Sequence, residues 1–523
     1  MNIFKINKIS WLAPFRKAGI FNILAIAVLY IALIYRLCLI AFPVVDNTEI
    51  GRDYWIARHI LVFHEFPLAG PWNEVYQAYV NSPLYYYVLA ALTFFHDSLL
   101  TLSVFNILAQ IASCSLIYVI GKKLFSPAAA LVGVIFYLTS WEMALQSRTI
   151  WQPQLMQPFL YASLLFLLLY YERKKQSFVI ASVILFAAAG ALHNSVFSLF
   201  PGYALILLFA LHKHKAPVKS WLKVFSIFTA AVASLYVPVA YYFFQNKNSL
   251  LTELSASQKY NFSFIVFFEN VKKVFLVLFN DFVINFNIQV VSRQTVAIVA
   301  LGAFVLAYAF IKFPKSKKNS LITAVFLLQP IILAALFRAN ISRYHLIVIY
   351  GLFCLLVAEV IVALADKYKI LLLPAGLLIF LLIQIFSANF YFLNYSPTLN
   401  WSSGVMDEAV ESIATEVTAI SAKQEAKKND FFDLKLYNPI VLNPYEELFW
   451  APLEKHFGME FTRLSNRTTP FKVLNSDGYI FLICQGVDEE LCRTKFANDY
   501  PAHALIKKIF DKGPFIIFIS KKV

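Results

Sequence analysis

The sequence predicts an α-helical polytopic membrane protein that ends in a small α/β domain. Two observations support this prediction. Of the 523 residues, 60% are hydrophobic and only 14% are charged, so a water-soluble fold would have too little polar surface to cover its apolar mass. Apolar stretches of roughly 17 to 25 residues also recur along the chain, and helices of that length cross about 30 Å of hydrocarbon.

We expect about eleven transmembrane helices from these stretches. They are predicted at residues 20–42, 99–120, 127–144, 154–171, 177–192, 194–211, 221–243, 294–311, 319–337, 345–365 and 370–390. A shorter apolar segment at 83–96 would reach only about 21 Å as a helix, so we expect it to lie at the membrane surface. This assignment places every basic cluster on one side, and the positive-inside rule then puts the N-terminus in the cytoplasm.

The net charge of +15 does not indicate a nucleic-acid-binding protein, because the basic residues form short clusters between apolar spans. The membrane part is predicted to cover residues 1–394, with outer loops at 43–98 and 244–293. Residues 395–523 have an ordinary soluble composition and are predicted to form an α/β domain outside the cytoplasm.

This outer domain contains two features that the sequence singles out. The short apolar runs YIFLIC and FIIFIS are predicted to be strands. Cys484 and Cys492 lie eight residues apart in a compartment that permits disulfides, and their spacing leaves open whether they are bridged.

The first outer loop concentrates charged residues in a chain that is otherwise short of charge. Asp46, Glu49 and Asp53 are spaced so that a helix beginning near residue 47 would place them on one face, with Arg52 beside them. A carboxylate there could take a proton from an acceptor hydroxyl, and the arginine could bind a phosphate leaving group. The alternative is a capping box formed by Asp46 and Glu49, which leaves Asp53 unexplained.

Two motifs resemble those of GT-C glycosyltransferases related to protein O-mannosyltransferases and the lipid A aminoarabinose transferase. The run TEIGRD, followed by PLYYY at 83–87, is similar to an Asp-x-Gly-Arg-Asp pattern in the first outer loop of bacterial relatives, with Glu49 at the first acidic position. The run SRTIWQPQLMQP is similar to the family's Ser-Arg-x-x-Trp-Asn-Pro turn and supplies Arg148 and Trp151. A weaker third likeness, ALHNS, contains His193.

The resemblance implies an inverting glycosyltransferase in the bacterial inner (cytoplasmic) membrane. Its donor would be a polyprenyl phosphate carrying one sugar, and its acceptor a cell-envelope molecule such as lipid A or lipopolysaccharide, another glycan or a protein. Donor, acceptor and membrane lipids are the expected partners. Transfer would occur at the outer face of the membrane.

The predicted site residues fall into three groups. The candidate catalytic carboxylates are Glu49, Asp53 and Asp46, and the sequence leaves open which of them is the base. Cations are rare at the outer turns, so an isolated arginine there is not explained by the orientation of the protein in the membrane. An anionic ligand is the better explanation. The alternative is an arginine that snorkels from the end of a span to the membrane surface. The predicted phosphate-binding residues are Arg52, Arg148, Arg343 and His345. The predicted sugar or acceptor contacts are Trp151, Tyr85 and His193.

Three questions stay open at this level. No ligand spacing requires a metal, but the loop carboxylates together with His59 could build a divalent-metal site. A transporter or flippase of lipid-linked saccharides would need ionisable residues near the bilayer midplane, where Arg36 and Glu359 are the main candidates. A glycan-polymer ligase would differ only in a donor that carries a chain instead of one sugar.

Overall fold

The computed structural model describes most of the first half of the chain and selected parts of the second. The described residues are 18–39, 48–71, 79–97, 99–140, 143, 151–245, 343–368, 408–409, 411–413, 415–416, 432–437, 479–485, 489–490, 493–494, 503–512 and 515–522. The predicted spans at 294–311, 319–337 and 370–390, the outer loop from 246 onward and the predicted boundary at 394/395 lie outside these residues.

The chain divides into two compact units, which we describe separately. Unit 1 comprises residues Met1–Arg36, Pro67–Tyr85 and Val104–Ala388. Unit 2 comprises Leu37–Phe66, Tyr86–Ser103 and Asn389–Val523.

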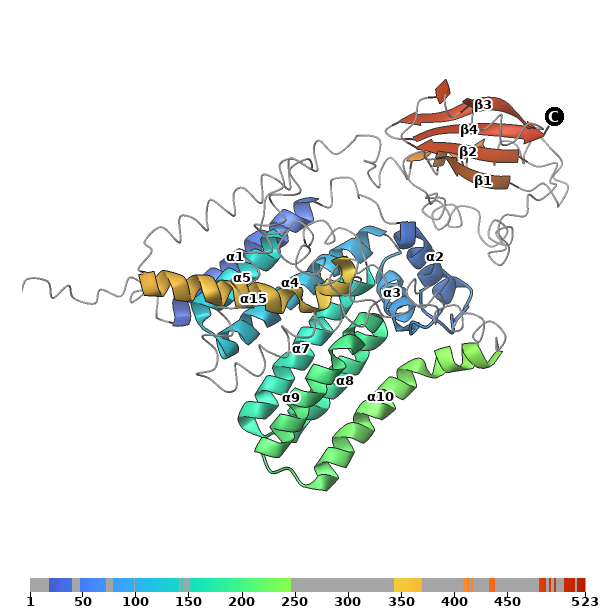
Figure 1. Cartoon of the computed structure of the whole chain (residues 1–523). Coiled ribbons are helices and arrows are strands. Elements are labelled where there is room, and N and C mark those ends of the chain that lie inside the picture. The colour runs from blue at the N-terminus through green and yellow to red at the C-terminus, as the bar shows by residue number, and fades with distance from the viewer. Residues whose placement is uncertain are drawn as a thin grey trace, which may run out of the picture. The chain divides into compact units, whose positions relative to one another are not determined.

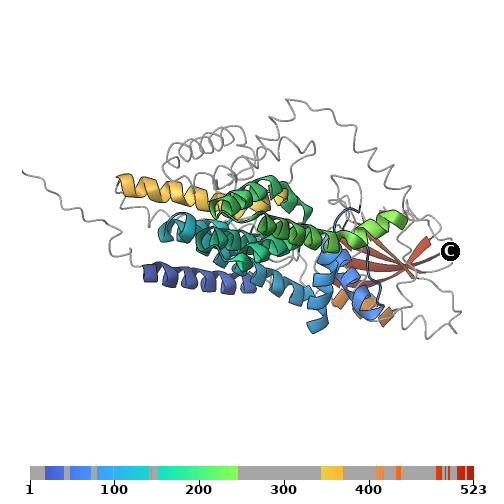
Figure 2. The ribbon, with the colours of Figure 1, turned by 90° about the horizontal axis from the view of Figure 1, so that it is seen from below.

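Unit 1 is a bundle of long helices. Its elements are, wholly or in the greater part, α1 (Ala18–Leu39), α4 (Leu99–Leu124), α5 (Pro127–Thr139), α7 (Gln152–Arg173), α8 (Gln176–Leu192), the 3₁₀ helix η2 (Asn194–Leu199), α9 (Phe200–Lys213), α10 (Val218–Gln245) and α15 (Arg343–Tyr368). Helix α8 packs against α7 and α10, and α15 packs against α5 and α7 (Figure 1). Figure 2 shows the long helices of this unit running along a common direction, as expected of a membrane bundle.

Six helical segments among the described residues are long and apolar enough to cross a membrane. They are Phe21–Cys38, Thr101–Leu124, Gln152–Arg173, Asn194–Lys213, Val218–Gln245 and Ile347–Ala365. Each coincides with a predicted span, so the polytopic helical fold is confirmed. The segment predicted to lie at the surface forms α3 (Leu84–Phe95), whose 12 residues extend only about 18 Å. Helix α5 ends at Thr139, whereas the predicted span extends to residue 144, past Ser140 and Glu142.

Helix α15 is the most buried of these spans, and glycines allow its close approach to its neighbours. A Cβ atom on Gly351 would lie 2.5 Å from Ile117 Cδ1 and 2.6 Å from the Tyr161 hydroxyl oxygen. A Cβ atom on Gly121 of α4 would lie 2.5 Å from Leu355 of α15. Small residues at such contacts let helix backbones approach where lipid supplies no hydrophobic driving force.

Unit 2 contains a mixed four-stranded sheet near the C-terminus (Figure 1). Its strands are β1 (Phe432–Tyr437), β2 (Tyr479–Gln485), β3 (His503–Lys512) and β4 (Phe515–Lys522). They are ordered β1-β2-β4-β3, with β1 parallel to β2 and the other pairs antiparallel. The two predicted strands, YIFLIC and FIIFIS, lie in β2 and β4 and are confirmed. Cys484 lies in β2, whereas Cys492 is outside the described residues.

Candidate functional site

The charged part of the first loop forms a helix, as its spacing predicts. Helix α2 runs from Thr48 to Val62 and belongs to unit 2. Asp53 is fully buried, and its Oδ1 accepts a hydrogen bond from Arg52 Nε at 2.9 Å and lies 2.8 Å from Arg52 Nη2 in an ion pair. The Arg52 side chain keeps 21% of its surface exposed. Of the predicted site residues, the structure therefore brings Arg52 and Asp53 together as one ion pair.

An aspartate that the sequence did not single out anchors the next turn of α2. Asp97, which follows α3, accepts a hydrogen bond from the Tyr54 hydroxyl at 2.6 Å and one from Arg58 Nε at 3.0 Å. The Arg58 side chain is only 8% exposed, whereas the Asp97 side chain is 36% exposed, so water reaches this ion pair from the carboxylate side. Because Tyr54 follows Asp53 directly, the same anchor fixes the orientation of the helix that carries the Arg52–Asp53 pair.

The C-terminal end of α2 is fixed by a local turn. His64 has a φ of 57°, which reverses the chain, and the amide of Glu65 then bonds to the His59 carbonyl at 3.4 Å. His59 Nδ1 lies 2.9 Å from Glu65 Oε2, and its ring lies 3.8 Å from that of Trp55. His59 is thus held by neighbours within its own segment.

In unit 1, the chain that leads into α3 closes on itself through tight backbone contacts. The amide of Gly70 donates to the Asn81 carbonyl at 2.7 Å, and a Cβ atom on Gly70 would lie 2.2 Å from the Ser82 carbonyl oxygen. Ser82 Oγ accepts from the Leu84 amide at 3.2 Å and donates to the Leu235 carbonyl at 2.8 Å. Only glycine fits at residue 70, because the two backbone segments nearly touch.

A second polar group of unit 1 surrounds the weak ALHNS motif. His193 ends α8, and its Nδ1 contacts Ser195 Oγ. The hydroxyl of Tyr236 in α10 bonds to Asn194 Oδ1, and Asn194 Nδ2 donates to the Val80 carbonyl at 3.4 Å. Asn194 therefore links α10 to the segment before α3, a role that the sequence did not reveal.

The other predicted residues have different positions. Trp151 is half-buried at the N-cap of α7, where its carbonyl accepts from the Gln154 amide at 3.0 Å. Tyr85 is fully buried in α3. Glu49 lies in the first turn of α2, and Arg343 and His345 lie in the first turn of α15, but their side chains are not described. Asp46 and Arg148 lie outside the described residues.

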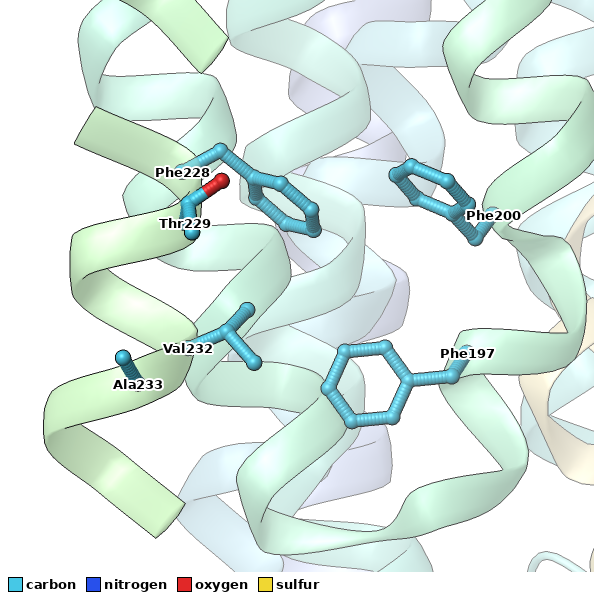
Figure 3. A pocket seen from close by; sticks show the side chains of 6 residues that line it. All are labelled: Phe197, Phe200, Phe228, Thr229, Val232 and Ala233. Atoms are coloured by element: carbon cyan, nitrogen blue, oxygen red, sulfur yellow. The ribbon is translucent and has the colours of Figure 1, made fainter. Parts of the chain in front are cut away.

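Unit 1 also contains an apolar cavity of about 370 Å³ between α10 and the start of α9 (Figure 3). Phe228, Thr229, Val232 and Ala233 line it from α10, opposite Phe197 and Phe200. Thr229 is the single polar residue in this lining, and none of the six is a predicted site residue. The cavity therefore suits a hydrocarbon chain better than a sugar.

The described residues include no group of three histidine, cysteine, aspartate or glutamate side chains that could hold a metal ion. Asp46 and the Glu49 side chain are outside that description, so metal binding at the loop stays a prediction.

The fold and the loop motifs together define a class, the polytopic membrane proteins with a GT-C fold. Within that class, residues 80–242 match the family model of dolichyl-phosphate-mannose-protein mannosyltransferases. The crystal structure of ArnT from Cupriavidus metallidurans bound to undecaprenyl phosphate has a TM-score of 0.58 and 11% identity, covering 95% of this chain and 97% of that one.

The apo structure of the same ArnT gives a TM-score of 0.58 at 10% identity, covering 96% of this chain and 98% of that one. None of the curated proteins matches the chain by sequence. The GT-C resemblance and the fold class are confirmed by the family-model match and by these two structures.

Proposed function

We propose that this protein transfers a sugar from a polyprenyl-phosphate donor to a cell-envelope acceptor. Transfer occurs at the outer face of the bacterial inner membrane and inverts the anomeric carbon. The family-model match and the likeness to a protein crystallised with undecaprenyl phosphate support a lipid-linked donor. The acceptor is lipid A or another lipopolysaccharide component, a different glycan or a protein.

The observation that carries this proposal is the buried Arg52–Asp53 pair. Asp53 Oδ1 accepts from Arg52 Nε and lies 2.8 Å from Arg52 Nη2, which fixes the plane of the guanidinium, and a guanidinium held in this way suits the oxygens of a phosphate. Fixed positive charge lowers the energy of a departing phosphate because negative charge develops on it.

The same pair suggests how the carboxylates divide the work. Asp53 is occupied in holding Arg52, so we assign it an orienting role. Glu49 lies one helical turn earlier in α2, at a position that shares the face of residue 53, and we assign it the role of general base. Asp46 remains an alternative base. A divalent metal at these carboxylates is compatible with either choice.

The proposal is tested with the purified protein and a radiolabelled polyprenyl-phosphate sugar. Glu49→Gln and Asp53→Asn should each lower turnover by about 10² or more. Glu489→Gln removes a carboxylate of the C-terminal sheet domain that pairs with Arg493 and Lys508, and as the control it should retain activity. Wild-type levels of transfer in both loop variants would contradict the assignment.

Two further measurements separate the alternatives. A flippase would move the labelled lipid across a vesicle membrane without consuming it, and a ligase would require a donor that carries a chain. Cysteine labelling from outside should reach residue 75 and positions after 395 but not residue 316. Labelling of residue 316 from outside would invert the topology on which the outer-face site depends.

A further inference from the structure

The apolar cavity between α10 and the start of α9 lies in the middle of a membrane-spanning helix pair (Figure 3). Phe228 is about 15 Å along α10 from its start at Val218, and Ala233 is about 18 Å from its end at Gln245. Both helices belong to segments that can cross a membrane, so the cavity lies at the depth of the hydrocarbon core. An apolar space at that depth is filled by hydrocarbon and not by water.

Small residues of α10 create this space. The run FTAAVAS at 228–234 places Thr229 and Ala233 one turn apart in the lining. Small side chains usually let helices approach closely, but the main packing partner of α10 among the described helices is α8, and the space beside Thr229 and Ala233 stays open. Because protein interiors are close-packed, an unfilled space of this size is unfavourable, and a bound ligand would remove that penalty.

The aromatic part of the lining is held in place by packing within unit 1. The ring of Phe200 stacks on that of Phe228, with centroids 5.3 Å apart and an interplanar angle of 8°. Phe186 of α8 is fully buried, and its ring lies 6.5 Å from Phe197, 6.4 Å from Phe200 and 6.3 Å from Phe228. The wall is therefore formed before any ligand binds, as is usual for ligand pockets.

One end of the cavity adjoins polar side chains. Tyr236 follows Val232 by one turn of α10, and its ring lies 6.0 Å from that of Phe197. The Tyr236 hydroxyl donates to Asn194 Oδ1 and to the Gly190 carbonyl, the latter at 3.3 Å. The predicted topology puts this end on the outer side. The order of polarity is then that of a lipid whose head lies at the outer surface and whose chain lies in the bilayer.

We propose that this cavity binds a segment of the polyprenyl chain of the donor lipid. The choice of this lipid rests on the proposed function, in which the chain stays in the bilayer while the phosphate reacts at the outer face. The volume of about 370 Å³ is that of a pocket for a drug-sized ligand, so it holds part of a long chain and not the whole of it.

Photo-crosslinking tests the occupant directly. The full-length protein in lipid nanodiscs is irradiated with an undecaprenyl phosphate analogue that carries a diazirine in its chain. The labelled peptides should contain residues 197–200 or 228–233, and unlabelled undecaprenyl phosphate should compete. The same excess of phosphatidylglycerol should not compete. Labelling elsewhere, or equal competition by the phospholipid, would refute a site for the polyprenyl chain.

Filling the cavity should weaken binding of a long chain only. Ala233→Phe should raise the Kd of undecaprenyl phosphate about tenfold, which corresponds to the loss of about two buried CH₂ groups. Thr229→Leu fills less of the space and should raise this Kd about fourfold, so it carries the test if Ala233→Phe does not fold. The Kd of geranyl phosphate should stay within about twofold in both variants, because its chain is too short to reach from the outer end of α10 to Ala233.

Ala230→Phe is the matched control, since Ala230 is an exposed residue of α10 outside the cavity lining. Its Kd for undecaprenyl phosphate should equal that of the wild type. An unchanged Kd in the correctly folded cavity variants, or an equal rise in Ala230→Phe, would refute the proposal.

These binding measurements need no sugar transfer, so they separate this inference from the proposed function. A protein that binds undecaprenyl phosphate in the cavity but transfers no sugar would leave the chain site standing and refute the proposed function. A protein that transfers sugar and keeps its Kd for undecaprenyl phosphate in Ala233→Phe would refute the chain site and leave the proposed function standing.

Discussion

The anchoring of α2 by Asp97 gives a prediction whose size can be worked from the contacts. Hydrogen bonds that involve a charged group contribute about 1.5 to 3 kcal/mol each, and Asp97 makes one with Tyr54 and one with Arg58. Its side chain is 36% exposed, so water screens part of this stabilisation and we expect about 1 to 2 kcal/mol in total. Asp97→Ala should therefore increase the local opening of α2 about 5- to 30-fold.

The assay is hydrogen exchange of the α2 amides, followed in Asp97→Ala and Asp97→Asn. The asparagine can still accept from the Tyr54 hydroxyl but loses the ionic attraction to Arg58, so its effect should be about half as large in free energy. Turnover should fall in the same order, because α2 carries the Arg52–Asp53 pair. Glu489→Gln, in the exposed ion pairs with Arg493 and Lys508, is the control and should leave α2 exchange unchanged. Equal protection of α2 in wild type and Asp97→Ala would refute the anchor.

Two other predictions concern stability. Gly351→Ala places a Cβ atom 2.5 Å from Ile117 Cδ1 and should destabilise the α15 contact by about 1 to 3 kcal/mol. The thermal midpoint in detergent should fall in this variant. It should stay at the wild-type value in the control Glu65→Gln. In the C-terminal sheet domain, hydrogen bonds from Lys508 and Arg493 hold the pKa of Glu489 below its usual value. The stabilisation from ionised Glu489 is present above the pKa that this group has in the unfolded chain, and it is lost as the pH falls through the lowered pKa of the folded state. When the β-sheet circular dichroism is followed during an acid titration, the Glu489→Gln variant should therefore depend less on pH than the wild type.

The sequence by itself determined the class of fold and the local elements that form the site. Span length and hydrophobicity are properties of contiguous residues, so the six spans among the described residues fall where the apolar runs predict them. The spacing of Glu49 and Asp53 predicted the helix that became α2. The strands YIFLIC and FIIFIS could also be predicted, because each is a contiguous apolar run in the sequence.

Only the tertiary structure decided how these elements are held. Arg36, more than 100 residues earlier in the chain, donates to the Leu138 carbonyl in the last turn of α5 and to the Met143 carbonyl, and the local sequence around α5 gives no sign of this partner. Asp97 has no motif around it, yet it anchors Tyr54 and Arg58 of α2. Such contacts join residues that are distant along the chain, and the choice of partner depends on how the backbone brings them together. Local sequence carries no signal for that choice.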